Sequence, residues 1–276
     1  MRITSLWAGR AAILGLALVG LPAGAATATQ QTLPWSVLPL VPARAESKAI
    51  GPDMVAAAPD GALAIWDPVD RAIRVLRSGA APASIPTDHV DDLAWTAAGI
   101  LLLDDTTRRL LLLSADGQRL ATLPLPGLAP VGLSLAVDGD EIDGADVFGN
   151  RHPLARLAGS ALVATDGHGL RPPAMAVRWD SANNEMWAGD RAFPVPGAIK
   201  ASGRVLGGWL VVDAVTGDGP IQVRRTAIPL GGGDPVTLPV STRLYAPTRD
   251  LAVNAAGHLF VLVPETAGLS IWEVTP

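Results

Sequence analysis

An all-β fold is predicted by three features of the 276-residue sequence. Short apolar runs alternate with turn residues such as Pro-Asp-Gly, a pattern typical of antiparallel strands joined by tight turns. The chain carries 29 glycines and 24 prolines, and a mostly helical chain does not tolerate so many because both residues destabilise helix interiors. After the N-terminal segment, no window keeps an apolar period of about 3.6 residues for three turns. The 49% hydrophobic content is sufficient for a packed core.

The clearest strand pattern covers residues 55–76. It contains a strand, a Pro-Asp-Gly turn, a second strand that ends at Asp67, a polar turn and a third strand. The pattern recurs from residue 92, where Gly99 lies 38 residues after Gly61 in the same turn position and Asp104 corresponds to Asp67. A fourth, outer strand at residues 120–123 completes a unit of about 40 residues, the size of one blade of a β-propeller.

Six such units are predicted, with five and seven as alternatives. After the first two, the units are expected at residues 132–170, 174–190, around 208–213 and at 251–274. The middle of the chain is the least regular part, and residues 159–166 can also be read as a strand pair of their own. The predicted fold is therefore a β-propeller of four-stranded antiparallel blades over residues 51–276.

The last unit has only three strands before the sequence ends at Pro276. An uncovered third strand would be an aggregation-prone edge, so we expect another segment to pair with it. Residues 35–41 are predicted to supply this outer strand, because the prolines around them suit a position whose outward N–H groups pair with nothing. Residues 27–50 are accordingly predicted to be an N-terminal arm that closes the ring.

Residues 1–26 are predicted to be a secretory signal peptide. Arg2 and Arg10 precede an apolar run that ends at Leu21, and small residues follow it. The alternative is an uncleaved membrane helix, but the run is shorter than the roughly 20 residues that span a bilayer. We expect the mature N-terminus to lie between Ala25 and Gln30, no membrane span after cleavage, and a periplasmic or secreted protein.

Charge and cysteine content exclude several classes of function. The formal net charge is −5, and loss of the two leader arginines makes it more negative, which does not favour a nucleic-acid partner because phosphate binding needs a basic face. There are no cysteines. A thiol nucleophile, a cysteine-ligated metal and a lipid anchor on cysteine are therefore excluded.

The first, second and last units resemble the NHL-type repeat, over about half of the chain. They share its hydrophobic strand, turn and second strand, and the first two units end the second strand with Asp67 and Asp104. Arg71 and Arg109 match the arginine that precedes the third strand in that repeat, whereas the last unit lacks it. The resemblance implies a six-bladed β-propeller fold and no particular activity.

Asp138, Asp140 and Asp143 are the candidate metal ligands. They belong to the densest acidic cluster of the sequence, and loop carboxylates can converge on Ca²⁺, which takes six to eight oxygen ligands. The spacing does not match an EF-hand. A solvated β-turn with aspartate caps is the favoured interpretation, so no cofactor is predicted, with calcium as the alternative.

Trp95 and Trp179 are the candidate binding residues. Both are expected on innermost strands, where a large ring fills the space between neighbouring blades, so packing is their default role. Lining the central channel is the alternative role for these two side chains.

The predicted function is an exported binding or assembly module without enzymatic activity. No activated serine, nucleophile elbow or patterned carboxylate pair is present, and the four histidines are scattered. Residues 143–173 and 192–204 are expected to be loops that bind a protein or small-molecule ligand. The alternative function is a metal-dependent hydrolase or lactonase similar to the gluconolactonase-type propellers, which hold a divalent cation at the channel mouth, although no full set of their ligands is matched.

Overall fold

The computed structural model describes residues 17–19, 27–41, 49–167, 169–173, 175–217, 221–240 and 247–276. Within this part of the chain every regular element is a β-strand, which confirms the all-β prediction. No helix among these residues is long and apolar enough to cross a membrane. Apart from residues 17–19, the predicted signal peptide lies outside the described residues.

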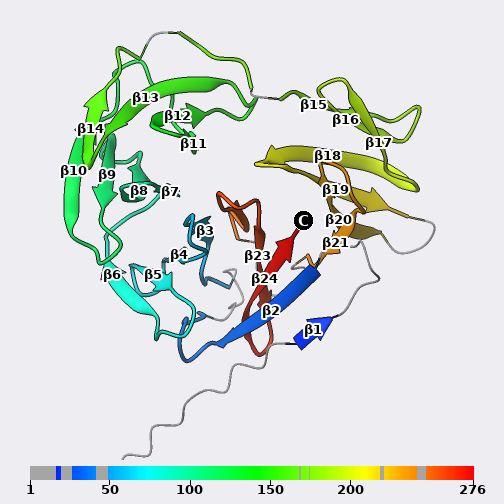
Figure 1. Ribbon diagram of the computed structural model, residues 1–276, viewed down its shortest axis with the longest axis horizontal. Helices are drawn as coiled ribbons and strands as arrows, with labels where there is room; N and C mark the ends of the chain where they lie inside the picture. Colours follow the sequence, from blue (N-terminus) through cyan, green and yellow to red (C-terminus); the bar gives the residue numbers. More distant parts are fainter. Residues whose placement is uncertain are drawn as a thin grey trace, which may run out of the picture.

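Six antiparallel sheets follow one another around a ring (Figure 1). The first sheet contains β3 (Met54–Ala57), β4 (Leu63–Asp67), β5 (Ala72–Leu76) and β6 (Ala83–Pro86). The second contains β7 (Asp92–Thr96), β8 (Gly99–Asp104), β9 (Arg109–Leu113) and β10 (Arg119–Pro124), and the third contains β11 (Ser134–Asp138), β12 (Glu141–Ala145), β13 (Arg151–Ala158) and β14 (Ala161–Ala164).

The second half of the ring is less uniform. The fourth sheet has three strands, β15 (Val177–Asp180), β16 (Glu185–Ala188) and β17 (Arg191–Pro194), and the fifth has β18 (Ala198–Leu206), β19 (Trp209–Thr216), β20 (Gln222–Pro229) and β21 (Val236–Leu238). The sixth combines β22 (Leu251–Val253), β23 (Leu259–Glu265) and β24 (Gly268–Thr275) with β2 (Thr27–Pro34) and β1 (Ala17–Val19). The predicted six-bladed β-propeller is thus confirmed, with three described strands in the fourth blade and five in the sixth.

An N-terminal strand closes the ring, as predicted, but it is not the predicted segment. β2 pairs with β24 along its whole length, from Thr27 with Thr275 to Pro34 with Gly268. The expectation for residues 35–41 is wrong, because they form a turn after β2 and end in an isolated bridge from Val41. The segment from Thr27 to Leu33 contains no proline and can therefore offer an uninterrupted ladder of N–H donors. A Cβ atom at residue 268 would collide with the carbonyl oxygen of Leu33, so this close pairing requires a glycine there.

The aspartates that end β4 and β8 hold the following turns, in line with the sequence pattern. Asp67 accepts hydrogen bonds from the backbone N–H groups of the next turn, and Asp104 accepts them from Thr107. Their side chains are almost fully buried. The repeat is therefore maintained by local turn chemistry.

The arginines assigned to the repeat are not equivalent to each other. Arg71 and Arg108 are the residues at matching positions, because both precede the third strand with a positive φ, 49° and 55°. The arginine that pairs with the closing aspartate is Arg74 in the first sheet and Arg109 in the second. Arg71 precedes the third strand, as the resemblance implies, whereas Arg109 is the first residue of β9, so the two arginines matched to the repeat do not occupy equivalent positions.

Apolar clusters fill five of the six interfaces between neighbouring sheets. Among the described residues, no such cluster lies between the third and fourth sheets, which are joined by the segment between β14 and β15 (Figure 1). Ile142 belongs to the cluster between the second and third sheets, so its neighbours Glu141 and Asp143 face the fourth sheet. Arg178 and Trp187 lie on the facing side of the fourth sheet, opposite Met186, which packs toward the fifth. No apolar cluster of the described residues therefore stabilises this interface, unlike the other five.

Candidate functional site

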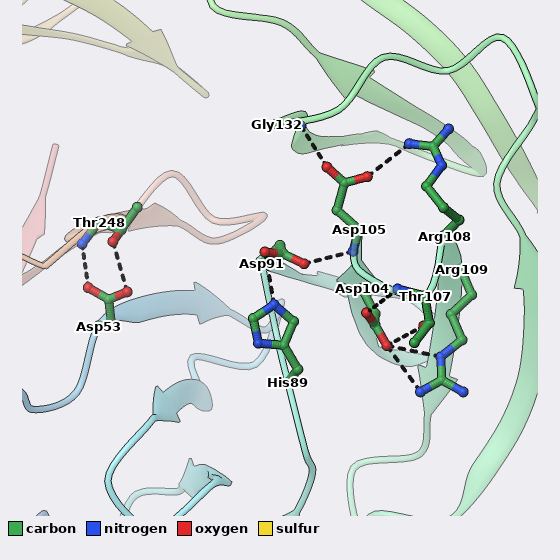
Figure 2. Close-up of polar contacts among 10 residues, drawn as sticks. All are labelled: Asp53, His89, Asp91, Asp104, Asp105, Thr107, Arg108, Arg109, Gly132 and Thr248. Carbon is green, nitrogen blue, oxygen red and sulfur yellow. Dashed lines mark hydrogen bonds and ion pairs between the residues drawn. The ribbon is translucent and has the colours of Figure 1, made fainter.

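The loops that lead into the innermost strands gather on one face of the ring. In an antiparallel blade, the start of the first strand lies on the same side as the turn between the second and third strands. Asp53, Asp91 and Thr248 therefore lie on the same face as the turn between β8 and β9, and Figure 2 shows them with Asp104, Asp105 and Thr107 of that turn. We call this side the channel face.

The carboxylates of the channel face hold neighbouring blades together. Asp53 accepts hydrogen bonds from the backbone N–H and the hydroxyl of Thr248, at 2.7 and 2.8 Å, which joins the first sheet to the segment before β22. Asp91 accepts one from the N–H of Asp105 at 2.7 Å, and Asp105 in turn accepts one from the N–H of Gly132 at 2.6 Å (Figure 2). These contacts join the sixth sheet to the first, and the second sheet to the start of the third.

A single arginine crosses the channel face. The backbone of Arg249 bridges to Met54 at the start of β3, while its Nη1 atom lies 2.6 Å from both carboxylate oxygens of Asp92 on β7. Its Nη2 atom donates to the carbonyl oxygen of Leu135 on β11 at 3.3 Å. Asp92 also accepts the N–H of Leu135 at 2.6 Å, and its side chain is only 4% exposed. The ion pair of Arg249 with Asp92 and the contacts around it therefore connect the sixth, first, second and third blades. The sequence pattern did not predict this ion pair.

Two of the pockets lined by described residues border Thr248 on the channel face. The larger, of about 480 Å³, has a floor that includes Met54 and Trp66 and a rim that includes Asp88 and His89. The smaller, of about 350 Å³, is lined by residues of the fifth sheet and of the segment before β22, among them Arg225.

Arg225 is fixed within the smaller pocket by two aspartates. Its guanidinium contacts Asp213 at 2.6 Å and also pairs with Asp250. Burial alone would lower the pKa of Arg225, but these hydrogen bonds and charges raise it above its usual value. The charge of this arginine is therefore permanent and already neutralised by its own neighbours.

Large apolar side chains are exposed on three loops of the third sheet. The residues are Leu128 (71% exposed), Val131 (77%), Val147 (87%), Phe148 (83%) and Leu170 (61%). The loops contact one another. Gly167 lies against Pro126 and Gly149 lies against Pro173. The backbones of Arg151 and Arg171 form an isolated antiparallel β-bridge. We call these five apolar residues the apolar loop surface.

Hydrogen bonds to Asp146 shape the tip of this surface. Asp146 accepts hydrogen bonds from the N–H groups of Phe148 and Asn150, both at 2.9 Å. These contacts define the turn between β12 and β13, which presents Val147 and Phe148 to solvent. Such preorganisation reduces the entropy lost when a partner binds.

Two of the three candidate metal ligands, Asp138 and Asp143, lie beside arginines. Asp138 and Asp140 are exposed at the turn between β11 and β12, whereas Asp143 is buried within β12. Arg151 lies 4.0 Å from Asp138 and 3.9 Å from Asp143, and Arg171 lies 3.5 Å from Asp143. The described residues contain no group of three or more histidine, aspartate or glutamate side chains placed to hold a metal. Calcium binding by the three aspartates stays a prediction that no observation tests.

Asp143 is buried at a cost, which predicts an unusual pH dependence. Its side chain is 2% exposed and its Oδ1 atom has no hydrogen-bond partner. Burial raises the pKa of this carboxyl above its ordinary value, against the opposing effect of Arg171 and Arg151. Above the raised pKa the folded state holds an ionised buried carboxylate, so this group destabilises the fold there, and the penalty is relieved as pH falls through the folded-state pKa. We expect Asp143→Asn to raise the free energy of unfolding by about 1 kcal/mol at pH 7 and to lose this advantage near pH 4.

Asp146→Asn is the matched control in thermal unfolding across pH. Hydrogen bonds, first from the side chain of Asn150, hold the pKa of Asp146 below its ordinary value. This group therefore stabilises the fold above its unfolded-state pKa, and the stabilisation is lost as pH falls through the folded-state pKa. Its substitution should lower the melting temperature at pH 7. If Asp143→Asn has the same sign as Asp146→Asn at pH 7, the assignment of a buried, destabilising carboxylate is wrong.

The two candidate tryptophans pack against apolar clusters. Trp95 on β7 contacts the cluster between the first and second sheets, and Trp179 on β15 contacts the cluster between the fourth and fifth. Both side chains are half-buried, and both strands come first in their sheets, as expected. A ligand-binding role for them stays a prediction.

The predicted binding loops are found in part. The range 143–173 contains β13 and β14, but also three members of the apolar loop surface. The expectation of a loop at residues 192–204 is wrong, since β17 and β18 occupy most of it. The adjacent apolar residues Val147 and Phe148, directly before the turn residues Gly149 and Asn150, were a sequence signal for an exposed apolar tip.

No protein-family model and no curated protein matches the chain. Solved structures similar to it include a gluconolactonase, XC5397, from Xanthomonas campestris, with 16% identity over 90% of each chain and a TM-score of 0.45. A streptogramin B lyase shows 13% identity over 88% of this chain and 100% of its own, with a TM-score of 0.40. The C-terminal WD40 domain of Sif2 shows 11% identity over 92% of this chain and 93% of its own, with a TM-score of 0.43.

Proposed function

We propose that this β-propeller is an exported binding or assembly module without enzymatic activity, and that it contacts a protein partner through the apolar loop surface. The observation that carries the proposal is the exposure of five large apolar side chains, between 61% and 87%, on three touching loops. Contiguous exposed apolar patches mark interaction sites, because their burial against a partner removes apolar area from water. Loops on a rigid ring are also where binding surfaces are commonly built.

The surroundings of the surface support a protein partner. A polar rim borders it, including Asp105 and Arg108, which pair with each other at 2.8 Å. An apolar centre with a polar, hydrogen-bonded rim is the usual anatomy of a protein interface. The fixed turn at Val147 and Phe148 supplies an aromatic anchor of the kind that dominates binding energy.

Two finer assignments belong to the same proposal. Export to the periplasm or the cell exterior rests on the N-terminal pattern of Arg2, Arg10 and the apolar run after them. Kinship with the NHL-type repeats rests on the turns closed by Asp67 and Asp104.

The binding proposal predicts the outcome of a double substitution, Val147→Ser with Phe148→Ser. The variant should keep its melting temperature, because both side chains are exposed, and its affinity for the partner captured by the wild-type protein from a native extract should fall at least tenfold. The measurement is quantitative affinity capture, followed by calorimetric titration with the purified partner.

Ile221→Ser with Val223→Ser is the control for loss of apolar surface. Ile221, directly before β20, is 78% exposed, and Val223 on β20 is 46% exposed. Both lie away from the apolar loop surface, so the same partner should bind this variant normally. The proposal would be contradicted if the Val147 and Phe148 double variant bound the partner with the affinity of the wild-type protein. Hydrolysis of a lactone by the purified protein, abolished by a chelator, would instead support the metal-dependent hydrolase.

A further inference from the structure

The closing strand β2 has an outer edge that is built differently from those of the other blades. β2 is eight residues long, whereas β6, β10, β14 and β21 have four, six, four and three. Its sequence from Thr27 to Leu33 carries no charge and no proline. By contrast, β10 contains Arg119 and an irregular register beside it. Charges, prolines, bulges and short length are the usual means of protecting an edge strand, and β2 lacks all four over seven residues.

This edge accepts a further strand. β1 pairs antiparallel with it, placing Ala17, Leu18 and Val19 opposite Gln30, Thr29 and Ala28. β1 belongs to the segment that we expect to be removed on export, and β2 begins at Thr27, close to the expected cleavage position. Removal of residues 1–26 would therefore expose the outer edge of an eight-residue strand that is already paired to β24 on its inner edge.

We propose that, in the chain that begins near Thr27, the outer edge of β2 pairs antiparallel with β2 of a second copy and joins the two sixth sheets into one. The proposal rests on the proposed export only through the removal of β1. A two-fold arrangement suits this strand, because an uncharged strand places no like charges opposite each other and its threonine and glutamine side chains can hydrogen-bond across the pair. An isologous contact of this kind closes at the dimer and requires no additional subunit.

The site is separate from the apolar loop surface. β2 lies at the outer edge of the sixth sheet, and the apolar loop surface belongs to the third sheet, on another part of the ring (Figure 1). Dimerisation through β2 therefore leaves Val147 and Phe148 exposed in both copies. A dimeric module would offer two equivalent binding surfaces and increase avidity for a partner that also presents more than one site.

The test is sedimentation velocity on the chain 27–276, which keeps every described strand except β1. Because this chain is produced directly, the result does not depend on whether export and cleavage occur. We expect a monomer at low concentration and a dimer of twice the mass at high concentration, since one strand edge is a small interface. Thr29→Lys should weaken dimerisation at least tenfold, because a lysine on an edge strand opposes pairing with a second strand, while Glu273 opposite Thr29 within the sheet can pair with the lysine in the monomer.

Ser84→Lys is the matched control, because Ser84 is exposed on β6, the outer strand of the first sheet. This variant should dimerise as the wild-type chain does, and the Val147 and Phe148 double variant should also dimerise normally. A chain 27–276 that stays monomeric at all concentrations overturns the proposal. The proposal is also overturned if Thr29→Lys dimerises like the wild-type chain at an unchanged melting temperature. It is overturned as well if Ser84→Lys weakens dimerisation as much as Thr29→Lys does.

Discussion

Deletion of residues 27–34 should lower the free energy of unfolding by roughly 4 kcal/mol. β2 pairs with every residue of β24 and contributes Leu33 to the cluster between the sixth and first sheets. Without it, Leu269 and Ile271, which are almost fully buried, lose their cover, and β24 becomes an unpaired edge. The measurement is urea unfolding followed by tryptophan fluorescence.

Deletion of residues 1–26 alone is the control for this experiment. It removes β1 but leaves β2, so it should change the unfolding free energy far less. An unchanged urea midpoint after loss of β2 would mean that the ring does not depend on its closing strand.

The second large effect is expected at Asp92. Asp92→Ala leaves the guanidinium of Arg249 and the N–H of Leu135 without their main acceptor, and it should cost about 3 to 5 kcal/mol, the typical result of breaking a buried ion pair from one side. The loss should be visible as a fall in both the urea midpoint and the melting temperature.

A double-mutant cycle separates the ion pair from general disruption. Asp92→Leu combined with Arg249→Met replaces both charges with apolar groups, and it should be more stable than either single variant, because no unpaired charge remains. Additive losses in the double variant would contradict a direct coupling between the two side chains. The side chain of Asp105 lies on the same face but is 15% exposed. Asp105→Ala should therefore lower the free energy of unfolding less than Asp92→Ala does.

The candidate site could be predicted only in part. The range that contains Val147 and Phe148 follows from the irregular middle of the sequence, yet the same reasoning placed a loop at residues 192–204, where β17 and β18 lie. That range contains Pro194, Pro196, Gly197 and Gly203, and such residues predict a loop, although Pro194 ends β17 and Gly203 lies within β18. The ion pair of Arg249 with Asp92 joins residues 157 positions apart, and neither residue is unusual in its own neighbourhood.

By itself, the sequence determined the all-β class, the repeated strand-turn units and the need for a closing strand. These follow from alternation, turn residues and the aspartates at residues 67 and 104, all of which act over a few positions of the chain. Only the tertiary structure decided that residues 27–34 close the ring, that no apolar cluster of the described residues joins the third and fourth sheets, and that Arg249 reaches Asp92. Each of these depends on which distant segments become neighbours when the ring forms, and that choice is made by the packing of whole sheets against one another, for which a local pattern carries no information.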